Sequence, residues 1–308
     1  MRNENFSTLN NRPTNILTTP YSNFCKEYEK SVKTRKHKHR ASYFSQQYAA
    51  EDINRGIKDK EGMRMRKGAG RLFARVIEVF KEKGICYVVR ATIKTIVYWS
   101  TELFRYYYYK IFRSSRTFTF QGETYNYFYH MYNMTWKNER AVELPIIWEI
   151  VKKYSGKRIL EVGNVLSHYF YVNHDILDKY DKARGVINQD VVDFHPSKKY
   201  DLIVSISTLE HVGWDEKPRE PTKILRATEN LKNLIASGGK IVVTLPLGYN
   251  NLLDKLLKEG RIPFTKCYFL KRILGDNRWI EVEEDDVHEA KYFGPFLGTS
   301  GLVIGIID

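Results

Sequence analysis

The stretch Arg158-Ile-Leu-Glu-Val-Gly163 decides the fold, because it joins a short apolar run to an acidic residue and a glycine. The run 159–162 has the length and composition of a buried strand. A glycine directly after a strand permits a sharp turn and lets the main chain approach a ligand closely. The stretch therefore predicts a strand of an α/β sheet with a binding site at its carboxyl end.

Short apolar runs follow downstream and alternate with helical patterns. The runs lie at 176–177, 185–187, 202–206, 241–245 and 302–307, and the clearest helical patterns lie at 221–236 and 251–259. A further helical spacing over 141–151 precedes the first strand. Alternating strands and helices favour a parallel sheet covered on both faces.

Acidic residues stand where the next two predicted strands end. Asp178 lies 17 residues after Glu161, and Asp190 and Asp193 follow the third strand. In dinucleotide folds a carboxylate at the end of the second strand, about 20 residues on, accepts the ribose hydroxyls. Asp190 and Asp193 compete for a role beside the third strand.

The order and spacing of five sequence pieces resemble the class I S-adenosylmethionine-dependent methyltransferases over roughly residues 136–308. The pieces lie at 159–163, 178, 190–193, 200–212 and 237–246. The resemblance implies an α/β fold with a Rossmann-like, doubly wound, mostly parallel seven-stranded sheet. Its antiparallel last strand, at 302–307, would lie beside a sixth strand at about 267–271. The chain departs from the family in one loop, because Val165 and Ser167 stand where the family usually has glycines after Gly163.

S-adenosylmethionine is the cofactor that the resemblance implies. Glu161 and Gly163 would flank its methionine part, Asp178 would hold the ribose, and Asp190 with the backbone of Val191 would meet the adenine. The full set of expected cofactor residues is Glu161, Gly163, Asn164, Asp178, Asp190, Val191, Ser205 and Arg140.

Three of these roles have structural alternatives. Glu161 would otherwise cap the turn at the end of its strand, and Asp178 would otherwise be one solvated charge among several. Arg140 would pair its guanidinium with the methionine carboxylate if the aromatic segment 117–136 closes over the cofactor. That segment would otherwise be a hydrophobic brace on the sheet.

His211 is the best candidate for a general base, because it follows the fourth strand at the rim where open α/β sheets bind ligands. Glu210, Asp215 and His288 are the other catalytic candidates, and a structural role for His211 stays open. Two adjacent residues, Glu210 and His211, are a poor ligand set, so no metal is predicted.

The favoured activity is O-methylation of a hydroxyl on a small molecule or glycan. A nucleic-acid methyltransferase is less favoured, since 207–213 lacks a Pro-Pro-aromatic motif and no cysteine follows a proline. A catalytically inactive Rossmann-like module is the third reading. The loop with one glycine supports this reading, and the acids at 161, 178 and 190 oppose it.

The basic character lies in the N-terminal third. Residues 1–120 hold 25 Lys and Arg against 10 Asp and Glu, and residues 121–308 hold 25 against 26. We expect three parts: a basic, disordered or loosely helical tail (1–62), a basic amphipathic helical region with a break at Gly84 (63–116), and the methyltransferase domain (117–308). A basic arm binds nucleic acid, anionic lipid or an acidic protein, or is simply solvated.

The helices at 71–112 have two readings, a peripheral anchor on anionic membranes or a helical hairpin that packs on the catalytic domain. No apolar run reaches the ~18–20 residues of a membrane span. The N-terminus lacks a secretory pattern, and three cysteines without pairing or metal spacing fit a reducing compartment. We therefore expect a cytoplasmic protein, with peripheral membrane contact as the further option.

Overall fold

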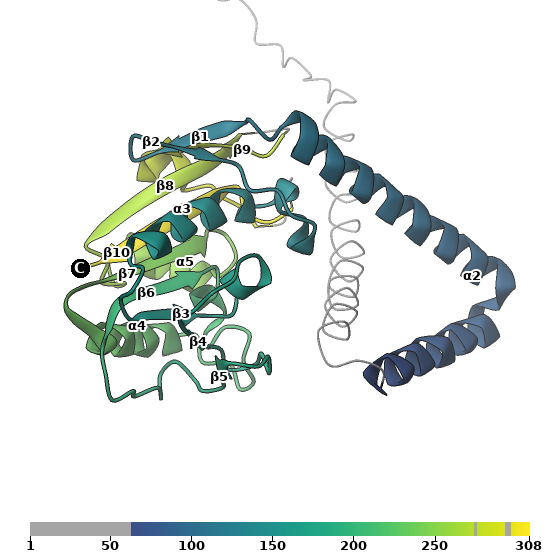
Figure 1. Cartoon of the computed structure of the whole chain (residues 1–308), viewed down its shortest axis with the longest axis horizontal. Helices are drawn as coiled ribbons and strands as arrows, with labels where there is room; N and C mark the ends of the chain where they lie inside the picture. The colour runs from purple at the N-terminus through teal and green to yellow at the C-terminus, as the bar shows by residue number, and fades with distance from the viewer. Residues whose placement is uncertain (1–62, 274–275, 293–296) are drawn as a thin grey trace, which may run out of the picture. The chain divides into compact units, whose positions relative to one another are not determined.

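The computed structural model describes residues 63–273, 276–292 and 297–308 (Figure 1). The predicted tail at 1–62 lies outside these residues. The chain divides into two compact units, Met1–Thr95 and Ile96–Asp308. The division into three parts at 62 and 116 stays a prediction.

Helix α2 (Met63–Phe112) is interrupted at Gly84, which has φ 76° and ψ 168°. This is the position where the sequence predicts a break. A positive φ of this size is open to glycine because glycine has no Cβ. Among the described helices, none combines the length and apolar character that crossing a bilayer requires.

The aromatic segment begins as a hairpin of β1 (Thr117–Phe120) and β2 (Glu123–Asn126). Both turn residues, Gln121 and Gly122, have positive φ, as two-residue hairpin turns of the primed type require. Phe118 and Phe120 are buried. The Tyr127 hydroxyl accepts a hydrogen bond from the backbone N–H of Trp279 at 2.8 Å. This part of the segment therefore braces the sheet, as one alternative predicted.

A 3-10 turn, η1 (Tyr132–Lys137), leads into helix α3 (Arg140–Lys153). Pro145 lies inside α3 and has no N–H to donate to the carbonyl of Ala141, one turn earlier. The backbone N–H of Phe128 donates to that carbonyl instead, at 3.0 Å. The proline is therefore accommodated because the aromatic segment supplies the missing donor.

The main sheet has eight strands in the order β5-β4-β3-β6-β7-β10-β8-β9. The first five are parallel, and β10 runs antiparallel between β7 and β8. In chain order the strands are β3 (Ile159–Val162), β4 (Asp175–Leu177), β5 (Val186–Ile187), β6 (Tyr200–Ile206), β7 (Ile235–Pro246), β8 (Lys266–Ile273), β9 (Arg278–Val282) and β10 (Gly301–Ile307).

This topology confirms the predicted Rossmann-like sheet and its antiparallel last strand. The eighth strand, β9, was not predicted, because its sequence Arg-Trp-Ile-Glu-Val contains two charged residues in five. It adds to the edge of the sheet by antiparallel pairing with β8.

Two of the predicted helices cover the connections around β7. Helix α4 (Lys223–Leu234) precedes β7 and α5 (Asn251–Lys258) follows it. The connection from β3 to β4 holds only a 3-10 turn, η2 (Leu166–His168), and β6 is followed by another, η3 (Leu209–His211). Because each 3-10 turn comes within a few residues of the end of its strand, its side chains lie close to the carboxyl rim of the sheet.

The core has two layers, one on each face of the sheet. Ile224 and Leu231 of α4 pack with Ile203 and Val243 on one face. Leu144 and Ile147 of α3 pack on the other face with Leu202, Val204 and Val242. Alternate residues of β6 and β7 thus enter opposite layers, as the pleat of a strand covered on both faces requires.

Candidate active site

The turn after β3 requires the glycine at position 163. Gly163 has φ +90°, and a Cβ built there would lie 2.2 Å from Oγ1 of Thr208. Its N–H donates to the carbonyl of Leu177 at 2.8 Å. The backbone at Gly163 therefore passes close to the loops that follow β4 and β6.

Glu161 caps this turn. One carboxylate oxygen accepts hydrogen bonds from the N–H groups of Val165 and Leu166 at 2.8 and 2.7 Å. The other oxygen lies 2.9 Å from Nε2 of His174, and Glu161 is fully buried. The capping alternative thus describes the observed contacts. A role for Glu161 beside the methionine part of a cofactor stays a prediction. In that role Glu161 would position the loop 163–166, whose backbone would then contact the cofactor.

The loop that lacks the usual glycines is held by packing instead. Leu166 is fully buried. His168 stacks on Tyr132 at a ring-centroid distance of 4.5 Å, and Phe170 stacks on Trp148 at 4.2 Å. Larger side chains in this loop therefore anchor it to η1 and α3.

Asp178, at the end of β4, organises the neighbouring turn. Its Oδ1 accepts from the N–H groups of Tyr180 and Asp181, each at 2.8 Å, and its Oδ2 accepts from the N–H of Asn164 at 3.1 Å. The Asn164 side chain in turn donates to Asp181 at 2.8 Å. A carboxylate has about four lone-pair sites. Asp178 therefore retains capacity to accept from a ribose hydroxyl.

Asp190 belongs to a network of four charged side chains. Its Oδ2 contacts Nζ of Lys179 at 2.7 Å and Nζ of Lys223 at 2.5 Å. Both lysines also pair with Glu216, at 3.0 and 2.7 Å. Burial acts to raise the pKa of Asp190, but the hydrogen bonds from the two lysines outweigh it and lower the pKa to about 2. Asp190 is thus committed to an ion-pair network rather than open toward an adenine, while Asp193 is exposed.

Two other predicted cofactor residues have structural contacts. Ser205 is fully buried, and its hydroxyl donates to the carbonyl of Val162 at 3.1 Å. Val191 is buried, and its carbonyl accepts from the Asn230 side chain at 2.7 Å. Ser205 therefore joins two strands of the sheet and Val191 anchors α4. The cofactor roles of Ser205 and of the Val191 backbone stay predictions, and the Ser205 hydroxyl and the Val191 carbonyl already have these partners within the protein.

Arg140 lies at the start of α3, below the end of β6. Its Nη1 donates to Glu143 at 3.0 Å and to the carbonyl of Ile206 at 3.1 Å. Because both bonds use Nη1, the other guanidinium donors remain for a carboxylate ligand. The predicted pairing with the methionine carboxylate stays a prediction.

The carboxylates around Arg140 are residues that sequence reasoning missed. Glu143 is fully buried and accepts from the hydroxyls of Ser207 and Thr244. Burial, and then the charge of Glu143, raise the pKa of Glu139 to about 7. The only sequence indication that these two side chains face the protein interior was their position at, and just before, the start of an apolar helical pattern.

His211 and Asp215 form a pair at the rim after β6. Nδ1 of His211 lies 2.5 Å from Oδ2 of Asp215, and the Tyr249 hydroxyl donates to the same oxygen at 2.5 Å. The Tyr249 ring packs edge-to-face with the rings of His211 and Tyr292, at ring-centroid distances of 4.7 and 4.9 Å. Burial acts to lower the pKa of His211, but the hydrogen bond to Asp215 and the charges of Glu210 and Asp215 outweigh it and raise the pKa.

Glu210 lies behind this pair. It is 1% exposed, its Oε1 lies 3.6 Å from Nε2 of His211, and its Oε2 has no hydrogen-bond partner among the described residues. Burial raises the pKa of Glu210 to about 7. The structure thus brings together three of the four catalytic candidates, Glu210, His211 and Asp215, and adds Tyr249.

His288 does not join this group. It lies at the end of η4 (Glu284–Val287), is exposed, and points a ring nitrogen at the carbonyl of Asp285. A catalytic role for His288 stays a prediction, and the structure gives it no contact with the other three candidates among the described residues. Within the described ranges, no set of three or more His, Cys, Asp and Glu side chains is arranged to hold a metal ion.

No family model matches the chain, and no curated protein matches it. Solved structures of S-adenosylmethionine-dependent methyltransferases are similar to it. One from Clostridium acetobutylicum ATCC 824 has 10% identity and a TM-score of 0.28, and the match covers 52% of this chain and 88% of that chain. The N-methyltransferase NodS from Bradyrhizobium japonicum WM9, in complex with S-adenosyl-L-homocysteine, has 12% identity, a TM-score of 0.31 and coverages of 53% and 85%.

The sugar N-methyltransferase KedS8 from Streptoalloteichus sp ATCC 53650 has 13% identity, a TM-score of 0.30 and coverages of 55% and 87%. The fold class itself is defined by this chain's own strand order. That order places an antiparallel strand between the last parallel strand and its neighbour, as the resemblance to class I methyltransferases implies.

Proposed function

We propose that the domain is an S-adenosylmethionine-dependent methyltransferase that acts on a hydroxyl of a small molecule or glycan. The observation that carries the proposal is the His211–Asp215 pair at the carboxyl rim of the sheet, with Nδ1 and Oδ2 2.5 Å apart. Ligands of open α/β sheets bind at this rim. A histidine whose Nδ1–H is held by a carboxylate presents an unprotonated Nε2 to a substrate.

The residues present fit the cofactor in part. The turn at Gly163 gives backbone access, and Asp178 retains an acceptor site for a ribose hydroxyl. Arg140 offers further donors for a carboxylate. Asp190 does not fit, because two lysines hold it. When bound, S-adenosylmethionine supplies an electrophilic methyl group on a sulfonium.

The chain's own residues account for the proton of the acceptor. Nε2 of His211 accepts the hydroxyl proton as the oxygen becomes a nucleophile. Asp215 and Tyr249 fix the imidazole ring, and the negative charge of Asp215 stabilises the imidazolium. Because the His211 side chain is 46% exposed, the proton then passes to solvent.

An amine acceptor is the nearest alternative within the same activity, since the sugar enzyme KedS8 is named an N-methyltransferase. A protonated amine must also lose a proton, so the base alone does not choose between oxygen and nitrogen. The hydroxyl is favoured because its proton is held more firmly at neutral pH and needs a positioned base.

A non-catalytic binding module is the second candidate, and one specific observation favours it. The carboxylates of Glu161 and Asp190, expected beside the methionine part and the adenine of the cofactor, are engaged by the protein itself. On this reading neither carboxylate contacts a cofactor. The domain would then bind a partner without transferring a methyl group.

Calorimetry with S-adenosylmethionine and S-adenosylhomocysteine separates the two candidates. The enzyme binds both compounds, and the module binds neither. A positive result leads to a labelled-methyl screen of hydroxylated glycans, small phenols and matched amines. With an accepted substrate, His211→Ala should lower turnover by about 10²–10⁴ and leave cofactor affinity unchanged. Binding without transfer to any hydroxyl, but with transfer to an amine, would overturn the hydroxyl assignment.

We also infer a cytoplasmic location. Among the described residues, Cys86 and Cys267 are exposed free thiols, which supports a reducing compartment.

A further inference from the structure

The segment Ile96–Phe112 of α2 has one side that contacts the domain. Tyr98 bonds to the sulfur of Met134 at 3.7 Å, and Glu102 pairs with Lys137 at 2.5 Å. Tyr106 and Tyr109 contact Trp136 and Tyr129, with ring centroids 5.6 and 5.1 Å apart. Positions 98, 102, 106 and 109 recur every three or four residues, so they lie on one face of the helix.

The opposite side of the same segment is apolar and exposed. Phe104 is 73% exposed, Ile111 62% and Ile96 59%. The apolar stripe consists of positions at helical spacing, all of them exposed, with Ser100 in its middle: Ile96, Ser100, Leu103, Tyr107 and Ile111, flanked by Val97 and Phe104. Within Ile96–Phe112, the domain contacts described above come from the other side.

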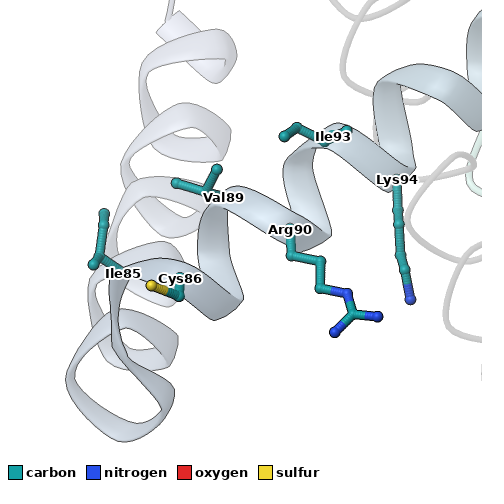
Figure 2. Close-up of a pocket in the computed structure, with 6 residues that line it drawn as sticks. All are labelled: Ile85, Cys86, Val89, Arg90, Ile93 and Lys94. Atoms are coloured by element: carbon teal, nitrogen blue, oxygen red, sulfur yellow. The ribbon is translucent and has the colours of Figure 1, made fainter.

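The same spacing continues in the preceding turns of α2. Ile85, Val89 and Ile93 are exposed and line an open apolar pocket together with Arg90 and Lys94. Figure 2 shows Val89 and Ile93 on one side of the helix, while Arg90 and Lys94 point to the other. Within Ile85–Lys94, the apolar and the basic side chains therefore lie on different sides of the helix.

The exposed charges on Ile85–Phe112 are all positive. The four basic residues of this stretch are exposed: Arg90, Lys94, Arg105 and Lys110. Its one acid, Glu102, is 2% exposed and pairs with Lys137 and Arg105. An anionic surface is therefore the complementary partner for this stretch of the helix.

The spacing of the stripe favours a flat partner over a second helix. Its five positions from 96 to 111 recur on average every ~3.75 residues, which is above the ~3.6 of a straight helix and further above the ~3.5 of a heptad coiled coil. Tyr107 belongs to the stripe, and Trp99 and Tyr108 are exposed beside it. Tryptophan and tyrosine favour the interface between water and lipid.

We propose that the apolar stripe of α2 lies in the headgroup region of a membrane that contains anionic lipids, and that the negative potential of that surface attracts the exposed basic side chains of the same helix, Arg90, Lys94, Arg105 and Lys110. Burial of apolar side chains at the acyl boundary and attraction of basic side chains by anionic lipid act together in such helices. This binding goes beyond methyl transfer and does not depend on it.

The test is sedimentation of the full chain with vesicles of phosphatidylcholine alone or with 30% phosphatidylserine, an amount set for the experiment at roughly the anionic content that attracts polybasic segments. The wild type should pellet with the anionic vesicles, and binding should fall as salt rises. The double variant Phe104→Asp with Ile111→Asp should weaken vesicle binding at least about tenfold. It removes two apolar side chains that the membrane would bury and adds two negative charges. The matched control is Ile280→Asp, an exposed isoleucine on β9, which should bind as the wild type does.

The outcomes separate the alternatives. Equal pelleting of the double variant would show that the basic tail alone binds lipid and would overturn the proposal. If the wild type is a dimer without lipid and the double variant a monomer, the stripe is an interface between copies and the proposal fails. Loss of binding to RNA rather than to vesicles would assign the surface to nucleic acid instead. Circular dichroism verifies that both variants retain the fold, and Arg90→Glu with Lys94→Glu provides a second, charge-only variant with the same expected loss.

Discussion

His211 and Asp215 are four residues apart in the chain, and Nδ1 of the histidine lies 2.5 Å from Oδ2 of the aspartate. The Tyr249 hydroxyl, from the connection between β7 and α5, donates to the same oxygen. The pair therefore ties together the loops that follow two neighbouring parallel strands. Under the proposed activity, an acceptor would bind at this place on the carboxyl rim of the sheet.

Asp215→Asn should lower turnover by about 10²–10⁴, because an amide can donate to Nδ1 and so favours the tautomer with the proton on Nε2. The charge of Asp215 also raises the pKa of His211. The acidic limb of the kcat profile should therefore move to lower pH in the variant. Steady-state rates across pH measure both effects.

Tyr249→Phe is the control for this variant, since it keeps the carboxylate and removes one hydrogen bond to it. It should cost less than about tenfold in turnover. If both variants lose activity equally and the profile does not move, His211 is a structural residue.

Asp178→Asn should weaken S-adenosylhomocysteine binding by about 1–3 kcal/mol, because the ribose hydroxyls lose a charged acceptor. The asparagine keeps one oxygen for the turn that Asp178 holds, so the fold should survive. Calorimetry gives the affinity and thermal unfolding gives the stability. Glu229→Gln, at an exposed acid on α4, should leave the affinity unchanged. An Asp178→Asn protein with normal affinity would assign the ribose to another residue.

The sheet was predictable from the sequence because its strands are buried on both faces. The run Ile241–Leu245 is almost wholly apolar, and the runs that end at Val162, Leu177 and Ile206 are followed directly by a glycine, an acid and a serine. The loop at 163–174 was not predictable in the same way. It forms only the 3-10 turn η2, and His168 and Phe170 stack on aromatic rings from earlier segments, contacts that have no sequence pattern.

The site was predictable in its residue types and less so in its partners. His211 and Asp215 are four residues apart in the sequence, so their pairing could have been predicted from that spacing. The contact of Asp190 with Lys179 and Lys223 joins three separate segments and has no sequence pattern. Glu139 and Glu143 were missed because charged residues in a helix usually face solvent.

Gly163→Ala should destabilise the fold and reduce cofactor affinity, because the new Cβ would lie 2.2 Å from Thr208 Oγ1 at a φ of +90°. The strain of a positive φ alone costs about 1–3 kcal/mol. Gly185→Ala isolates that cost, since Gly185 has φ +87° and nothing within 4 Å of the added Cβ. Urea unfolding of both variants should show a larger loss for Gly163→Ala. Equal losses of unfolding free energy in the two variants would mean that the loop of Thr208 shifts and removes the clash with the added Cβ.

Glu210→Gln should change how stability depends on pH. Burial raises the pKa of Glu210 to about 7 from an ordinary value of 4.5, so the folded protein binds this proton more tightly than the unfolded chain does. The resulting stability is fully present below pH 4.5 and is lost as the pH rises through about 7. Glutamine has no proton to lose, and the pKa of His211, which the charge of Glu210 raises, would fall as well. Both changes flatten the slope, so the variant should match the wild type near pH 4 and exceed it at pH 8 by on the order of 1–3 kcal/mol. Urea unfolding at several pH values measures this difference in the free energy of unfolding.

Glu229→Gln, at an exposed acid on α4, is the control and should leave the slope of stability against pH unchanged. A wild-type slope in Glu210→Gln would mean that Glu210 is charged in the folded protein, which requires a partner for its Oε2 in solution.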